Sequence, residues 1–394
     1  MSKINKKIVG IIITICITAL FQTAFVKAAE MENETINNTI IENVNYQEIE
    51  QYWDTIIDEY GGHLPDINKV SFIDLLYKND KLSITAIINS TIKYFFQEII
   101  INGKLLIVLF LLTIFSSVLQ TIHSAFENES VSKIAHFVIY LVLFYISLNS
   151  FMLTFSYATS AIQSMSDFIL ALIPLILGLL STIGNLLTVS FFHPLIIFII
   201  NVTNLIISKF ILTFLLLSFL LIIVSYINQQ YRVTYLANLF KNISLGTLGV
   251  ISTLFLSIMS IQGTASAVQD GLALKTAKFV TGNFIPVIGK TFTDAVDIVL
   301  SASQTLKNSI GIIGVLIIII YALFPAMKIL AIAFIYKLAA AILQPIGDES
   351  IVKTLNTISN YTLYVLACLI AVTFMFFLSI VIIVLASNIT MFIK

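Results

Sequence analysis

The sequence predicts an all-α fold: a polytopic bundle of membrane helices with a small helical region outside the cytoplasm at its N-terminus. Of the 394 residues, 58% are hydrophobic and 11% are charged, and the mean hydropathy is +1.01. A soluble globule of this length cannot bury so much apolar surface. Several apolar runs also approach the roughly 18 residues that cross a bilayer core. The net charge is zero and Arg232 is the only arginine, so no basic patch indicates nucleic-acid binding.

Residues 1–28 have the pattern of a secretory signal peptide. Three lysines among the first seven residues precede an apolar stretch over 8–25, and Val-Lys-Ala forms a cleavage site after Ala28. An uncleaved signal anchor fits the same residues. After a signal peptide, the region that follows lies outside the cytoplasm.

Residues 29–103 form this extracytoplasmic region. Apolar residues recur at helical spacing in "YQEIEQYWDTIIDEYGG", and the two glycines can end that helix. The run "ITAIINSTIKYFFQEII" predicts a second amphipathic helix. Two interpretations stay open: the apolar stripes lie on the membrane surface or a partner, or they form a cap on the chain's own membrane domain.

The membrane domain over 104–394 is expected to hold about nine or ten membrane elements. Lys209 lies near the middle of a long apolar stretch over 191–227 and predicts a tight hairpin there. The loop with Arg232 and Lys241 is expected in the cytoplasm by the positive-inside rule. The apolar stretches lie at about 105–122, 134–155, 168–187, 192–207, 210–227, 243–262, 308–324, 328–343 and 361–387.

Two pairs of short matches indicate an internal repeat, roughly 160–262 and 275–387. "FILALIPLILG" resembles "FVTGNFIPVIG" at an offset of about 112 residues, and "LFKNIS" resembles "LNTIS" at a similar offset. Duplicated halves are common in transporters and channel-like folds. Chance similarity between isoleucine-rich segments is the competing explanation.

The stretch "TGNFIPVIGKTFTDAVDIVLSAS" carries a polar stripe in an otherwise apolar chain. Lys290, Asp294, Asp297 and Ser301 recur at positions i, i+4, i+7 and i+11, which is one face of a helix. Ionised groups facing lipid are costly. The helix therefore lines an aqueous path or a subunit contact, or it lies in the outer interface of the membrane with its polar face in water.

Prolines and glycines near both repeat matches are candidate helix-break residues. A proline between two glycines permits a broken or re-entrant helix. The sidedness of 263–307, as an outside segment or a crossing, is left open. The candidate helix-break residues are Pro174, Gly282, Pro286 and Gly289.

Lys337 is the remaining candidate for the pathway or subunit contact. It lies among alanines that suit close helix packing. In one interpretation it pairs with Asp294 or Asp297, and in the other it extends its ammonium to the membrane interface.

The sequence predicts no catalytic, cofactor-binding or metal-binding residues. "VIGKT" ends like a phosphate-binding loop, but Phe284 stands where that loop needs its first glycine. The four histidines lack metal-ligand spacing, and the common catalytic motifs do not occur.

Four long runs give the chain a family resemblance. Together with the signal peptide, they resemble stage III sporulation protein AE of endospore-forming Firmicutes, and the resemblance extends from about residue 60 to the C-terminus. The runs are "SIQGTASAVQDGLALKTAKFVTGNFIPVIGKTFTDAVDIVLSAS", "FFHPLIIFIIN", "YRVTYLANLFKNISLG" and "FPAMKILAIAFIYKLAAAILQPIGD".

The resemblance implies a role in a protein complex. The family belongs to the stage III A group made in the mother cell, which includes a partner ATPase. With stage II sporulation protein Q from the forespore, these proteins form a channel-like, secretion-related complex across the two membranes around the forespore. The resemblance implies a location in the mother-cell membrane around the forespore, and it carries no catalytic residues. A stand-alone permease for a small solute and a non-conducting scaffold are the competing functions.

Overall fold

The computed structural model describes residues 47–64, 72, 84–125, 129–182, 186–227, 233–284 and 288–392. The elements within these ranges are all helical, which confirms the predicted fold class. In chain order they are α2 (Gln47–Tyr60), η1 (Gly61–His63), α4 (Ile84–Ile101), α5 (Gly103–Ala125), α6 (Glu129–Thr182), α7 (Leu186–Leu205), η2 (Ile206–Ile211), α8 (Leu212–Ile227), α9 (Thr234–Phe284), α10 (Ile288–Leu343) and α11 (Glu349–Phe392).

Six helical stretches in the described part of the chain are long and apolar enough to cross a membrane. The expected number of about nine or ten elements is therefore wrong. The sequence predicts nine apolar stretches. Three pairs of them, in α6, in α7–α8 and in α10, each form one continuous helical run, which leaves six runs. Pro174 and Pro325 lie inside two of these helices. Neighbouring helices can satisfy the backbone groups that a proline leaves free.

The expected hairpin at Lys209 is also absent from the structure. Residues 206–211 form a π-helical segment, and the residues on either side of it, Leu205 and Leu212, have α-helical dihedral angles. The chain therefore continues straight from α7 into α8. The segment "IISKFI" contains no glycine, proline or asparagine to reverse the chain. A π-helical turn instead absorbs the irregularity, as such turns do within longer helices.

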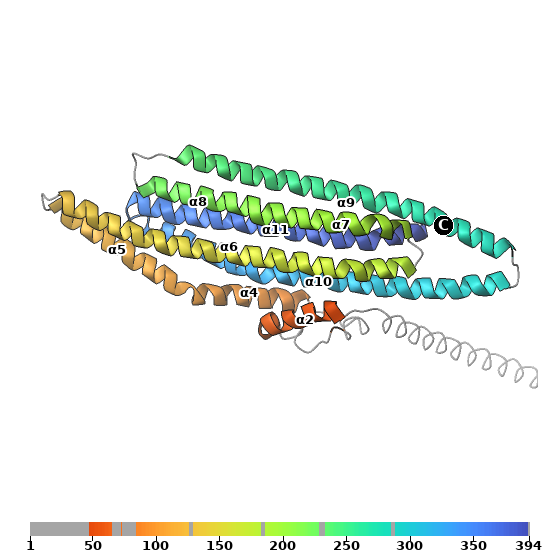
Figure 1. Cartoon of the computed structure of the whole chain (residues 1–394). Coiled ribbons are helices and arrows are strands. Elements are labelled where there is room, and N and C mark those ends of the chain that lie inside the picture. The colour runs from red at the N-terminus through yellow and green to blue at the C-terminus, as the bar shows by residue number, and fades with distance from the viewer. Residues whose placement is uncertain are drawn as a thin grey trace, which may run out of the picture.

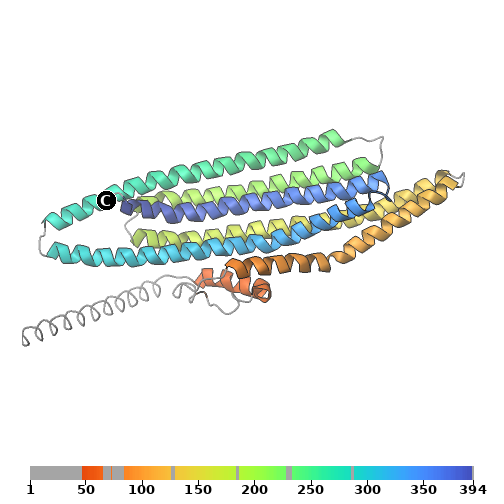
Figure 2. The same ribbon diagram turned by 180° about the vertical axis from the view of Figure 1, so that it is seen from behind.

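The long helices lie side by side in an antiparallel bundle (Figure 1). Helices α10 and α11 pack against each other and against α6 and α9. The α5–α6 hairpin extends beyond the bundle at one end, and the α9–α10 hairpin extends at the opposite end (Figures 1 and 2). At about 1.5 Å per residue, the 56 residues of α10 span ~84 Å. That length is well beyond the ~30 Å of a bilayer core.

Helix α2 packs on the chain's own bundle, beside α4, α6 and α10 (Figure 1). Its apolar stripe is buried, and Trp53 is 0% exposed. Tyr60 stacks on Phe324 of α10 with ring centroids 4.2 Å apart, and Tyr52 meets Phe168 of α6 edge to face at 5.4 Å. The Tyr321 hydroxyl also donates to the carbonyl of Tyr52 at 3.3 Å. The sequence leaves two interpretations open for the region 29–103. For α2, the contacts fit the interpretation in which the helix forms a cap on the chain's own membrane domain.

Candidate functional site

The four residues of the predicted polar stripe lie in the first turns of α10. Lys290, Asp294, Asp297 and Ser301 all fall within Ile288–Leu343, so one helix presents them at the predicted spacing. Their side chains lie outside the described set, and their role stays a prediction. Because the same helix continues to Leu343, the stripe is not a separate helix lying flat in the membrane plane.

The candidate helix-break residues have different positions. Pro174 lies inside α6, which continues to Thr182, so the break expected there does not occur. Gly282 is near the end of α9 and Gly289 near the start of α10. Pro286 lies outside the described residues. The stretch 263–307 is thus the end of one helix and the start of the next, and it does not form a single crossing.

Lys337 is exposed and donates to Asn356 Oδ1 of α11 at 2.6 Å. The pairing with Asp294 or Asp297 cannot occur within one chain. Lys337 and Asp297 are 40 residues apart on the same helix, 337 minus 297. At about 1.5 Å per residue they are separated by ~60 Å. The structure therefore places Lys337 in a contact between α10 and α11.

A polar network between α6 and α7–η2 was missed by the sequence analysis. We call it the Asp167 network. Gln163 Nε2 donates to Asp167 Oδ1 at 2.8 Å. Asn204 Nδ2 donates to Gln163 Oε1 at 2.9 Å, and Ser208 Oγ donates to Asn204 Oδ1 at 3.0 Å. In the sequence, this network is signalled by amide side chains that interrupt two neighbouring apolar runs. Whether those side chains contact each other depends on the register between the helices.

The Asp167 network is open to the surroundings, and it lies next to α2. Gln163 is exposed, while Asp167 and Asn204 are only half-buried. The pKa of the Tyr52 hydroxyl in α2 is raised above its usual value, first by burial and then by the negative charges of Asp167 and Glu48. A half-buried carboxylate and amides at this level need water or a polar partner, because lipid hydrocarbon cannot solvate them.

Buried hydroxyl groups join the helices inside the bundle. The hydroxyls of Tyr140 and Thr354 lie 2.8 Å apart, and the Tyr336 hydroxyl donates to Ser150 Oγ at 2.7 Å. Ser218 Oγ donates to the carbonyl of Ala237. These bonds connect α6, α8, α9, α10 and α11. They also satisfy buried polar groups that would be costly to bury without a hydrogen-bond partner.

Lys307 is a second group that the sequence analysis missed. Its side chain is 0% exposed, and its Nζ donates to the carbonyl of Val384 in α11 at 2.9 Å. Asn308 follows Lys307 directly in the sequence. A lysine buried between two candidate spans is rare and costly, so it is a candidate functional group by default.

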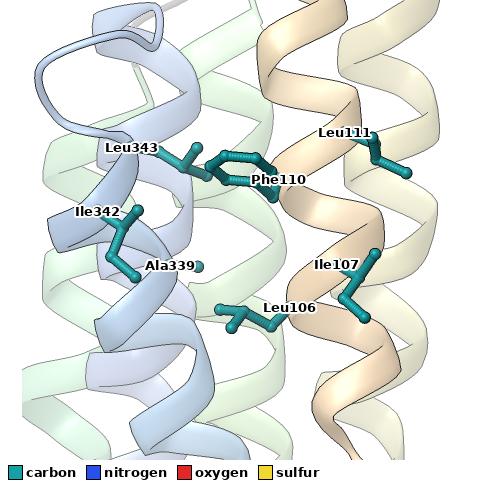
Figure 3. A pocket seen from close by; sticks show the side chains of 7 residues that line it. All are labelled: Leu106, Ile107, Phe110, Leu111, Ala339, Ile342 and Leu343. Atoms are coloured by element: carbon teal, nitrogen blue, oxygen red, sulfur yellow. The ribbon is translucent and has the colours of Figure 1, made fainter.

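An apolar groove separates α5 from the end of α10 (Figure 3). Its volume is about 260 Å³. Its walls suit a lipid chain or an apolar helix and offer no polar side chain to orient a small solute. The lining residues are Leu106, Ile107, Phe110, Leu111, Ala339, Ile342 and Leu343.

Within the described ranges, no group of three or more His, Cys, Asp or Glu side chains could hold a metal ion.

Six candidate spans around a filled helical interior define a polytopic α-helical membrane protein. The family model described as stage III sporulation protein AE matches residues 67–387. The chain is also 48% identical over 346 residues to stage III sporulation protein AE of Bacillus subtilis (strain 168). The aligned residues cover 88% of this chain and 87% of that protein. The chain belongs to the stage III sporulation protein AE family, and neither comparison indicates an enzyme family. No solved structure matches it.

Proposed function

We propose that this chain is an integral membrane subunit of the channel-like complex between mother cell and engulfed forespore. The observation that carries the proposal is the family match over residues 67–387, which takes in most of the bundle. The family implies the other stage III A proteins as partners, including their ATPase, and stage II sporulation protein Q indirectly. The membrane is then the mother-cell membrane around the forespore.

The filled interior supports a conduit formed between chains. Phe151, Phe219 and Phe376 are each 0% exposed, and Phe151 and Phe219 stack with centroids 4.1 Å apart. Side chains at interior density leave no room for a solute to pass. In this proposal the chain forms part of the wall, and its exposed polar groups face the path or other subunits.

The surface of α2 supports contact with extracytoplasmic partners. Four carboxylates of α2 are exposed, those of Glu48, Asp54, Asp58 and Glu59, and the helix contains no lysine or arginine. The signal peptide predicts this region outside the cytoplasm. An acidic surface there can steer a basic partner toward the complex.

The family resemblance implies a need for the chain in late forespore transcription, so a reporter of that transcription tests the proposal in vivo. Deletion of the chain is expected to lower late reporter activity and leave an early forespore reporter unchanged, and the full chain expressed in the mother cell should restore it. Normal late transcription in the deletion strain would refute the proposal.

Reconstitution separates this function from a stand-alone permease. The proposal predicts that the purified chain alone gives liposomes no solute uptake above that of empty liposomes. Saturable uptake by the chain alone would instead establish the permease.

A further inference from the structure

Helix α6 turns polar side chains outward in the middle of an apolar helix. Ser160 and Gln163 are exposed and Asp167 is half-buried, and their positions i, i+3 and i+7 put them on one face of the helix. The large apolar side chains that the described part of α6 exposes end at Leu153. The stretch lies inside the candidate span Phe137–Leu179. We call Ser160, Gln163 and Asp167 the polar face of α6.

The polar surface continues onto the neighbouring helices. Gln163 accepts a hydrogen bond from Asn204 of α7. Helix α2 lies against the same stretch, because Tyr52 contacts Phe168, the residue after Asp167. The four exposed carboxylates of α2 therefore stand beside the polar face of α6.

Helix α11 repeats this spacing with apolar residues. Ala367, Ile370 and Phe374 are exposed, and they also occupy positions i, i+3 and i+7 of one helix face. More than half of the surface of Ile370 and of Phe374 is uncovered, at 55% and 52%. Helix α10, which packs beside α11, exposes Ile312 and Ile319. We call Ala367, Ile370 and Phe374 the apolar face of α11.

The polar face of α6 and the apolar face of α11 lie at the same level of the bundle. The Thr373 hydroxyl of α11 donates to the sulfur of Met165 in α6 at 3.7 Å. A second contact, earlier on both helices, shows that α6 and α11 run in the same direction. Gln163 is two residues before Met165, and Ile370 is three residues before Thr373. At about 1.5 Å per residue, their levels differ by only ~1.5 Å.

The two faces look out from different sides of the bundle. Met165 contacts α11, and Gln163 and Asp167 are two residues before and after it. With 3.6 residues per turn, both lie roughly 160° around the helix from Met165. The polar face of α6 therefore points away from α11. One side of the bundle presents α6 and α7–α8, and the other presents α10 and α11 (Figures 1 and 2).

A single solvent at this level cannot suit both faces. Hydrocarbon all round would leave the carboxylate and amides of the polar face without solvation. Water all round would leave Ile370 and Phe374 exposed, in an apolar patch that continues on α10. At this level the bundle is therefore expected to contact lipid on one side and water or polar groups on the other.

We propose that the apolar face of α11 contacts lipid and that the polar face of α6 lines the water-filled path of the channel complex. Water fits this side better than a packed partner helix, because the carboxylates of α2 border it and α2 holds no lysine or arginine to pair with them. The inference names the side of the wall that meets the path, and it rests on the proposed function.

A matched pair of cysteine variants tests this assignment. Ser160→Cys lies on the polar face and Ala367→Cys on the apolar face, and both native residues are small and exposed. Ser160 is five residues before Met165 and Ala367 is six before Thr373, so the two thiols lie at one level. Opened membranes from sporulating cells are treated with an impermeant maleimide, which then has access from both sides. The parent chain, whose Cys368 is buried, gives the background.

Ser160→Cys is expected to react at least about tenfold faster than Ala367→Cys, because apolar surroundings keep a thiol from forming the reactive thiolate. Similar rates, or a faster reaction at Ala367→Cys, would overturn the inference. Ser156→Cys and Ile370→Cys form a second exposed pair on the same two sides and should show the same order. Immunoblots of the membranes check that each variant is inserted.

Recovery of partners from the same membranes separates this inference from the proposed function. If the tagged Ser160→Cys chain is recovered with the other stage III A proteins while its thiol is protected, the inference fails and the proposed function stands. If the thiol reacts but no partner is recovered, the proposed function fails, and the path assigned to the polar face fails with it.

Discussion

Ser244 of α9 and Ser359 of α11 each donate a hydrogen bond to the helical run that precedes the helix of that serine. Ser244 Oγ donates to the carbonyl of Ile211 at 2.5 Å, and Ser359 Oγ donates to the carbonyl of Ala333 at 2.9 Å. The two serines end the related stretches "LFKNIS" and "LNTIS". The two bonds span 33 and 26 residues, so they do not fall at corresponding positions of a repeat.

The other pair of matching stretches does not share a local structure. Residues 168–178 lie within α6, whereas 279–289 cover the end of α9 and the start of α10. The repeat limits 160–262 and 275–387 therefore stay predictions.

Ser359→Ala is expected to destabilise the bundle by about 1 kcal/mol, because it leaves the Ala333 carbonyl without this donor between α11 and α10. Ser379 of the same helix is equally buried, but it donates to Met375 of its own helix. Thermal unfolding in detergent should therefore show a larger loss for Ser359→Ala than for the control Ser379→Ala. The reverse order would contradict the assigned role of the bond.

Trp53→Ala is expected to release α2 from the bundle. The side chain is fully buried, and truncation of a buried tryptophan costs about 3–5 kcal/mol. Limited proteolysis should cut the variant near α2 much faster than the parent. Thr55→Ala, at an exposed position of the same helix, is the control and should be cut at the parental rate. Equal protection in both variants would show that α2 is not held by this contact.

Gly314→Val is expected to overpack the contact between α10 and α6. A Cβ at Gly314 would lie 2.7 Å from Leu172 Cδ2, whereas a Cβ at Gly249 of α9 meets nothing within 4 Å. Overpacking of this kind costs about 1–3 kcal/mol. The melting temperature of the purified protein should fall for Gly314→Val and hold for Gly249→Val. Similar melting of the two variants would exclude close packing at Gly314.

Combined neutralisation of Asp294, Asp297 and Lys337 is expected to lower spore yield while the protein stays inserted. The substitutions Asp294→Asn, Asp297→Asn and Lys337→Gln remove charges that the proposal assigns to the path or to subunit contacts. Lys353→Gln with Glu349→Gln removes an exposed ion pair at the end of the bundle away from Asp294 and Asp297 and serves as control. Spore counts and immunoblots give the measurement, and normal yield in the triple variant would favour the scaffold.

Composition was enough to predict the helical membrane fold, and helical spacing predicted the buried face of α2. Ile49, Trp53, Ile56 and Tyr60 recur at helical spacing, and all four are buried. Both features are local in the sequence. The number of crossings was not predictable from local sequence, because residues such as Pro174, Lys209 and Pro325 usually indicate that a membrane helix ends. Whether a long helix tolerates them is decided by its neighbours.

The polar contacts were the least predictable part of the candidate site. Gln163 and Asn204 are 41 residues apart, and Lys307 and Val384 are 77 apart. Their meeting depends on the register between long helices, which no short pattern encodes. Lys337 shows the same limit, because its partner proved to be Asn356 and not an aspartate of the polar stripe.

Gentle affinity purification of the tagged chain from sporulating cells, followed by mass spectrometry, tests whether the chain is a subunit of the channel complex. We expect the other stage III A proteins, including the partner ATPase, to be recovered with this chain and to be absent from an untagged control. Recovery of the chain alone, under conditions that keep another membrane complex intact, would contradict a role as a subunit of the channel complex.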